Sequence, residues 1–141
     1  MEYCRIDLSK SNYIPETTWN FIRNVDIDEL NLIYKKYCEY KKFASVVPIF
    51  DSQYTDINND IIGYYEESLL IGFSLVHRFD TSNAECIQFA WDYNNPKIRL
   101  GIASLKTECA VYKLQGFKYL YIGCSDPYKE QIQGYEIIGK L

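Results

Sequence analysis

The sequence has very little of the chemistry that ordinary zinc sites use. It contains one histidine, His77, and its five cysteines are scattered without a C-x-x-C pair. Zinc sites take cysteine and histidine ligands at short, regular spacings, so the sequence excludes a zinc site of the usual kind and predicts no bound metal. Unpaired thiols in odd number are typical of a reducing compartment.

Long apolar runs are also absent. No stretch approaches the roughly 18 residues that a membrane-spanning helix needs, and residues 1–10 lack the apolar core of a signal peptide. We therefore expect a cytoplasmic protein with no membrane partner. No linker rich in Pro, Gly or Ser, no low-complexity tract and no internal repeat divides the chain, which predicts a single domain over residues 1–141.

Positive charge is in deficit. Lys and Arg number 15 against 19 Asp and Glu, which gives a net charge of −4. Proteins that bind nucleic acid through many phosphates usually carry net positive charge or a basic patch, so the overall charge counts against a tRNA partner. Arg99, Lys106 and Lys113 recur every seven residues and could form a local basic stripe on one helix face. A solvated helix face is the alternative reading.

The N-terminal part predicts a strand or ordered arm at residues 3–8 and then two helices. Pro15 followed by Glu16 is typical of a helix start and predicts a short helix to about residue 24. Asp26, with Glu29 three residues later, forms a capping box that begins a second helix. The apolar face of that second helix comprises Leu30, Ile33, Tyr34 and Tyr37. Residues 45–59 are expected to form a loop.

Three strand-like runs follow, at residues 60–66, 69–79 and 85–93, joined by tight turns. Strict alternation assigns the side chains of each strand to two faces. One face of the second strand takes Ile71, Phe73, Leu75, His77 and Phe79, and in the third strand Ile87, Phe89 and Trp91 oppose Gln88, Ala90 and Asp92. A meander with an apolar face needs a helix packed on it, and His77 is expected to be a hydrogen-bonded core histidine.

That helix is predicted directly after Asn94-Asn95-Pro96. Its apolar positions are Ile98, Ile102, Leu105, Cys109 and Tyr112, and Gly116 ends it. Strands are predicted at Tyr119–Ile122 and Tyr135–Ile138. Because a crossover helix joins two strands, a local parallel pair is expected. The fold class is therefore α+β, with N-terminal helices, a mixed and mostly antiparallel sheet, and a long helix after the meander.

The junction between the third strand and the long helix predicts an anion site. Gly101 and Ala103 keep the first helical turn free of bulk, so its backbone N–H groups and the helix dipole can meet an anion. Lys97 and Arg99 add positive charge. The alternative is that Gly101 only lets the helix pack closely on a strand. The candidate donor-binding residues are Lys97, Arg99, Leu100, Gly101, Ile102 and Ala103.

This junction resembles the pyrophosphate-binding turn of the GNAT acyltransferase superfamily, whose signature is Q/R-x-x-G-x-G/A. Gly101-x-Ala103 matches the end of that signature, whereas Ile98 stands where Gln or Arg is expected. The resemblance implies a GNAT-like fold and an acetyl-CoA-dependent N-acetyltransferase.

A closer resemblance, over about residues 26–138, is to the C-terminal catalytic domain of arginyl-tRNA–protein transferases. That family has an aromatic-rich strand, a Ser-Leu-Gly helix start, a Tyr-Leu-Tyr-Leu-Gly strand and a Tyr-Lys-x-x-Phe-x-Pro-x-Glu segment. The similar pieces here are Phe89–Tyr93, Leu100-Gly101, Tyr119–Gly123, and Tyr128-Lys129 with Glu136. The resemblance implies aminoacyl-tRNA as donor and a protein or small amine as acceptor. The family's Cys-rich N-terminal region is absent, the connection from Gly123 to Tyr128 is short, and Gly134 replaces a proline.

Acyl transfer to an amine needs a proton acceptor, a proton donor and groups that orient the substrates. Glu85 and Asp92 are candidates for base or amine anchor, and Tyr128 for proton donor. Gln88 and Lys129 are candidates for substrate binding. Each has a structural alternative: solvent-facing strand ends for Glu85 and Asp92, packing for Tyr128, and a satisfied polar group for Gln88.

Three functions stay open at this stage. They are an aminoacyl-tRNA-dependent transferase, an acetyl-CoA-dependent N-acetyltransferase, and a catalytically inactive binding module of the same fold. No permanently bound cofactor is expected, since the acyl donor, aminoacyl-tRNA or acetyl-CoA, is a substrate. The oligomeric state is left open.

Overall fold

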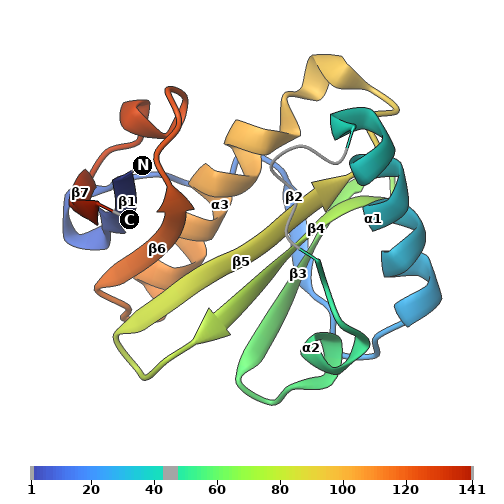
Figure 1. The fold of residues 1–141 in the computed structure, drawn as a ribbon, viewed down its shortest axis with the longest axis horizontal. Helices are drawn as coiled ribbons and strands as arrows, with labels where there is room; N and C mark the ends of the chain where they lie inside the picture. Colours follow the sequence, from blue (N-terminus) through green and yellow to red (C-terminus); the bar gives the residue numbers. More distant parts are fainter. Residues whose placement is uncertain (1, 43–47, 141) are drawn as a thin grey trace.

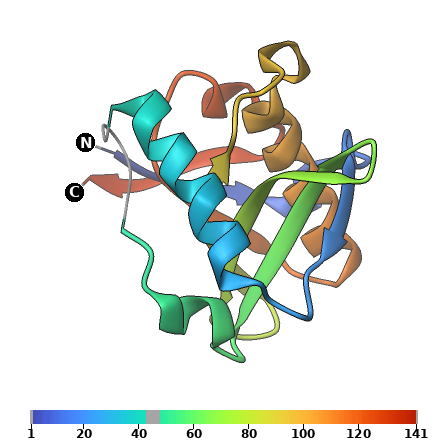
Figure 2. The ribbon, with the colours of Figure 1, turned by 90° about the vertical axis from the view of Figure 1, so that its right-hand side faces the viewer.

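A computed structural model describes residues 2–42 and 48–140, which form one mixed sheet between two helical layers. The strand order is β2-β3-β4-β5-β6-β1-β7. Helices α1 and α2 cover one face and α3 covers the other (Figures 1 and 2). The elements are β1 Glu2–Asp7, η1 Leu8–Lys10, β2 Thr18–Phe21, α1 Ile27–Lys41, α2 Asp51–Thr55, β3 Asn59–Glu66, β4 Leu69–Arg78, β5 Asn83–Trp91, η2 Pro96–Ile98, α3 Leu100–Leu114, β6 Tyr119–Cys124, η3 Lys129–Gln131 and β7 Tyr135–Lys140.

The predicted parallel pair is present. Strands β5 and β6, which α3 connects, are parallel, whereas the other neighbouring strands of the sheet are antiparallel. The N-terminal segment is a full strand: β1 lies between β6 and β7 and pairs with both. The α+β architecture with a mixed, mostly antiparallel sheet is thus confirmed.

The predicted short helix from Pro15 to about residue 24 is wrong. Residues 18–21 form the edge strand β2, which pairs with β3 from Thr18↔Tyr65 to Phe21↔Ile62. The segment is rich in residues that favour strands, and Trp19 and Phe21 pack edge to face with ring centroids 5.3 Å apart. The unpaired backbone groups at the β3 edge supply the hydrogen bonds that override the local Pro-Glu helix signal.

The second predicted helix is confirmed as α1. The Asp26 carboxylate accepts a hydrogen bond from the Glu29 N–H at 3.2 Å, as the capping box requires. Leu30, Ile33 and Tyr37 are buried, while Tyr34 is half-buried. The predicted loop 45–59 contains the short helix α2, which the sequence pattern did not reveal. Residues 45–47 of that prediction lie outside the described residues.

The three meander strands lie where they were predicted, to within two residues at each end. One irregularity matters for the site. Leu75 pairs with Gln88 and Val76 with Cys86, so Ile87 is an extra residue in β5. This bulge interrupts the strict alternation assumed for β5 and turns Cys86 to the same face as Val76. His77 is a hydrogen-bonded histidine, as predicted, with Nδ1 2.6 Å from the Asn59 side-chain oxygen.

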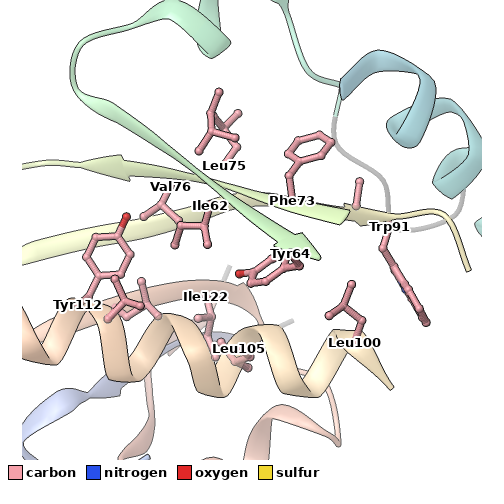
Figure 3. Close-up of a cluster of buried hydrophobic side chains, with 14 of the residues drawn as sticks. Ile62, Tyr64, Phe73, Leu75, Val76, Trp91, Leu100, Leu105, Tyr112 and Ile122 are labelled. Atoms are coloured by element: carbon pink, nitrogen blue, oxygen red, sulfur yellow. The ribbon is translucent and has the colours of Figure 1, made fainter. Parts of the chain in front are cut away.

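The long helix α3 supplies the core of one layer (Figure 3). Its Leu100, Leu105 and Tyr112 lie toward the sheet, where Ile62, Tyr64 and Val76 meet them. Phe73 and Leu75 point from β4 to the opposite face. Each fully buried side chain of this size contributes about 1.5–3 kcal/mol, so α3 is fixed firmly against the strands.

Candidate active site

Strands β5 and β6 are paired only at their beginnings. The register runs Asn83↔Tyr119, Ala84↔Leu120 and Glu85↔Tyr121, and no pair follows, although β5 continues to Trp91 and β6 to Cys124. The two strands therefore diverge after the Glu85–Tyr121 pair, as Figure 1 shows. In the diverging part of β6 the carbonyls of Ile122 and Cys124 accept hydrogen bonds from the Lys129 ammonium, so the segment after β6, and not β5, satisfies these groups.

The N-terminus of α3 follows β5 after residues 92–99, which include η2. Arg99 has a left-handed backbone (φ 52°, ψ 50°), Leu100 begins the helix, and no side chain among the described residues caps it. No described atom lies within 4 Å of the position that a Cβ on Gly101 would take. The reading in which Gly101 serves only close packing is therefore wrong. The space beside Gly101 in the first helical turn is therefore open, as an anion site at this helix start requires.

The six candidate donor-binding residues divide into two groups. Lys97 and Arg99 are exposed and carry positive charge beside the helix start. Leu100 is fully buried and Ala103 is 7% exposed, so these two residues can offer only backbone groups. Gly101 and Ile102 are half-buried. The predicted strand-to-helix turn is present, and its binding role stays a prediction.

Glu85 lies at the point where the strands part. Its Oε2 accepts a hydrogen bond from the Tyr3 hydroxyl of β1, which reaches across β6. This bond fixes the carboxylate in place. Burial raises the pKa of the Tyr3 hydroxyl, and the hydrogen bond to Glu85 and the Glu85 charge raise it further. Glu85 is half-buried rather than a free solvent-facing end.

Asp92 and Gln88 form hydrogen bonds with residues near them in the chain. The Asp92 carboxylate accepts hydrogen bonds from the backbone N–H and the side-chain amide of Asn94, at 3.0 and 3.1 Å, and so shapes the turn after β5. Gln88 is 7% exposed and donates from Nε2 to the Phe89 carbonyl at 2.8 Å. These contacts agree with the structural alternatives for both residues.

Tyr128 and Lys129 lie in the segment between β6 and β7. The Lys129 ammonium donates to the carbonyls of Ile122 and Cys124, both at 2.8 Å, and lies 3.5 Å from the Asp126 carboxylate. Lys129 therefore holds the end of β6. Burial raises the pKa of the Tyr128 hydroxyl, and the charges of Cys86 and Asp126 raise it further. The Tyr128 hydroxyl stays protonated at neutral pH, as a proton donor must.

The sequence reasoning missed Glu108, which is 2% exposed on α3. Its Oε1 accepts from the Cys86 thiol at 3.5 Å and from the Tyr64 hydroxyl at 3.4 Å. Burial raises its pKa to about 7. A signal existed, because Glu108 stands three residues after Leu105 and four before Tyr112, on the apolar face of the helix.

The predicted basic stripe on α3 is largely occupied by the N-terminal segment. Lys106 forms an ion pair with Glu16 at 3.2 Å. Lys113 donates to the Ser11 carbonyl and, at 3.2 Å, to the Asn12 side chain. Of the three, only Arg99 stays exposed and available for a phosphate.

Neither a metal site nor a membrane helix is found in the described part of the chain. Residues 2–42 and 48–140 contain no group of three or more His, Cys, Asp or Glu side chains placed to hold a metal ion. No helix within these ranges combines the length and the hydropathy that crossing a membrane requires.

Comparison with known proteins identifies the fold. No family model and no curated protein matches the sequence. Among solved structures, the chain is similar to L-PGS from Bacillus licheniformis (TM-score 0.67, 13% identity, 88% of this chain and 46% of that one). It is equally similar to a C-terminal domain assigned to a lysylphosphatidylglycerol synthetase of Agrobacterium fabrum (TM-score 0.68, 9% identity, the same coverage).

A GCN5-related N-acetyltransferase from Anabaena variabilis also matches (TM-score 0.63, 9% identity, 98% of this chain and 37% of that one). The chain spans less than half the length of these three structures. At these identities the likeness shows a GNAT-like fold and leaves the activity to be argued from the site.

Proposed function

We propose that this chain is a GNAT-fold acyltransferase that moves an acyl group from a phosphate-bearing carrier to an amine. One observation carries the proposal: β5 diverges from β6 and leads within a few residues to the uncapped N-terminus of α3. The helix start would give the carrier's phosphates a binding site, and the carrier would extend from there along the part of β5 that is no longer paired with β6.

The donor phosphates would bind the first-turn amides around Gly101, where no side chain intrudes. Lys97 and Arg99 would add charge attraction at the same place. The acyl end of the carrier would then reach toward Glu85 and Cys86, where β5 and β6 separate. This arrangement holds the carbonyl beside an incoming amine, which is most of what such a reaction requires.

In the proposed reaction the amine nitrogen attacks the acyl carbonyl, and the bond from that carbon to the carrier breaks. Glu85 would accept the proton that the amine loses. Tyr128 would give its proton to the leaving thiolate or alkoxide, and its raised pKa keeps that proton in place at neutral pH. Asp92 has no part in this step, since both its oxygens bind Asn94.

Acetyl-CoA is the donor that the charges favour. Lys106 and Lys113 are bound to the N-terminal segment, and the chain carries a net charge of −4, so few cations are left for a long polyphosphate ligand. Aminoacyl-tRNA is the second candidate. It is supported by the ordered resemblance from Phe89 to Glu136 and by the similarity to the lysylphosphatidylglycerol synthetase domain.

Thermal unfolding with each donor tests the proposal. A ligand that binds only the folded state adds about 2.7 kcal/mol of stability at 100 times its Kd. We expect acetyl-CoA to raise the Tm and desulfo-CoA, which keeps the phosphates, to do the same. Stabilisation by charged tRNA alone, lost as salt is raised, would select the aminoacyl-tRNA function instead. No response to either donor would leave a binding module without transferase activity.

A further inference from the structure

A pocket of about 360 Å³ lies beside the last paired residues of β5 and β6. It is lined by Tyr3, Phe79, Asp80, Asn83 and Tyr121. Tyr121 is the β6 partner of Glu85, the last paired residue of β5. Cys86 faces α3, and neighbouring residues of a strand face opposite sides, so Glu85 points to the other face of the sheet. The hydrogen bond from Tyr3 to Glu85 places the pocket on that face as well.

The walls of this pocket are mainly aromatic. The Tyr3 and Tyr121 rings are stacked with centroids 6.5 Å apart, and the Phe79 ring stands edge to face against Tyr121 at 6.4 Å. Phe79 is 56% exposed, so its ring is accessible to a ligand from solvent. Three aromatic side chains therefore line this pocket, and the electron-rich face of such a ring attracts positive charge.

The charged groups at the pocket are anionic. The Asp80 carboxylate accepts hydrogen bonds from the backbone N–H groups of Ser82 and Asn83, at 2.7 and 2.8 Å. These bonds lower the pKa of Asp80, so it stays ionised well below neutral pH. Glu85 adds a second carboxylate behind Tyr3.

The neighbouring rings already hold one cation. The Arg5 guanidinium lies 3.7 Å from the centroid of Tyr119 and 5.8 Å from that of Tyr121. Its charge is balanced by Glu136, whose Oε1 lies 2.8 Å from the Arg5 Nε. The pocket is likewise lined by aromatic rings, Tyr121 among them, and by the Asp80 carboxylate. None of the five residues that line it is a cation.

We infer that the pocket of Tyr3, Phe79, Asp80 and Tyr121 binds an alkylammonium group. A ligand cation above aromatic faces is attracted by their quadrupoles, and a nearby carboxylate adds charge attraction. The pocket adjoins the place where the acyl group is proposed to arrive. This assignment rests on the proposed function: the alkylammonium is a cationic group of the acceptor. The pocket holds it while a separate, neutral amine of the acceptor attacks the carbonyl.

Choline and its uncharged isostere, 3,3-dimethyl-1-butanol, are the probes that test this inference. NMR titration of the whole chain should show saturable shifts of aromatic resonances with choline and none with the alcohol. Phe79→Ala should weaken choline binding about two- to fivefold, which is the effect expected from the loss of one exposed cation–π contact. Asp80→Asn should weaken it as well. Its amide oxygen still accepts the backbone hydrogen bonds of Ser82 and Asn83, whereas the bond from the Asn83 side chain to Oδ2 is lost. Phe50→Ala, which removes a 69% exposed ring elsewhere, is the matched control.

Equal shifts with both probes, or unchanged choline affinity in Phe79→Ala and Asp80→Asn, would overturn the inference. The outcome is independent of the donor. If acetyl-CoA stabilises the protein and choline fails to bind, the pocket is wrong and the transferase proposal stands. If choline binds and neither donor does, the cation site stands and the transferase proposal fails.

Discussion

The Cys86 thiol lies 3.5 Å from the Glu108 carboxylate, beneath the point where β5 leaves β6. The bulge at Ile87 turns Cys86 toward α3, and the helix places Glu108 opposite it. Burial raises the pKa of Glu108 to about 7, and burial together with the Glu108 charge raises the pKa of the Cys86 thiol. Cys86 is therefore protonated at neutral pH and is a hydrogen-bond donor rather than a nucleophile.

This carboxyl makes the stability of the fold depend on pH. Between the ordinary pKa of 4.5 and about 7, the folded state holds a proton on Glu108 that the unfolded chain releases. Stability should therefore fall as pH rises through this window, by about 3–4 kcal/mol at most, and level off above it. Glu108→Gln keeps an acceptor oxygen and removes the titrating group. Urea unfolding should therefore show that the unfolding free energy of the variant, relative to that of the native protein, is higher at pH 7.5 than at pH 4.5.

Glu39→Gln, on the exposed side of α1, is the matched control and should leave the native pH profile unchanged. If Glu108→Gln and the native protein lose stability in parallel across this window, Glu108 is not the group responsible.

Substitution of Gly101 should separate donor binding from folding. A Cβ at Gly101 meets no described atom within 4 Å, and acidic residues are favoured in the first turn of a helix. Gly101→Glu should therefore fold with an unchanged or slightly raised Tm. Its carboxylate would occupy the phosphate site, and the thermal shift with acetyl-CoA should disappear.

Gly101→Ala provides the comparison, because it adds one methyl without charge and should gain up to about 1 kcal/mol from helix propensity. A Gly101→Glu protein that still binds the donor with native affinity would exclude the α3 N-terminus as the phosphate site.

Local signals predicted most of the fold. The capping residues Asp26 and Glu29 predicted α1, the alternation of apolar and polar residues predicted the meander strands, and apolar residues at helical spacing predicted α3. The edge strand at Thr18–Phe21 was not predicted because its stability comes from β3, whose paired residues lie 41 to 47 positions away in sequence, while the nearby Pro15-Glu16 signal is purely local. Sequence periodicity cannot register a bond made to a distant strand.

The candidate site divides in the same way. Gly101 and its turn could be predicted because a helix start is a local feature of the chain. The roles of Lys106 and Lys129 could not, because their charges are taken up by Glu16 and by the carbonyls of Ile122 and Cys124, which only the folded chain brings near. The contact of Cys86 with Glu108 depends on a bulge, which strict alternation cannot foresee.

A second glycine fixes how β4 meets α3. A Cβ on Gly72 would lie 2.7 Å from the Trp91 Cβ, 2.9 Å from the Ala90 carbonyl oxygen and 2.9 Å from the Leu100 Cδ2. Because backbone and rigid core atoms crowd this site, Gly72→Ala should cost about 1–3 kcal/mol of unfolding free energy. Gly139→Ala in β7, which meets no described atom within 4 Å, should change stability much less. Equal chemical-denaturation midpoints for the two variants would contradict this account of the close approach.

Tyr128 gives the sharpest test of the chemistry. Its ring is 44% exposed, so Tyr128→Phe removes the hydroxyl and leaves the packing of the segment nearly unchanged. If the hydroxyl protonates the leaving group, kcat for transfer from acetyl-CoA should fall about 10²- to 10⁴-fold while KM for the donor changes little. Because the pKa of the Tyr128 hydroxyl is raised, the native protein should lose activity by deprotonation of this group only at strongly alkaline pH. Tyr40→Phe, on a ring that is 60% exposed and stacked 3.6 Å from Tyr93, should leave kcat at its native value. Equal kcat values in the two variants would remove Tyr128 from the reaction and leave the leaving group to be protonated by water.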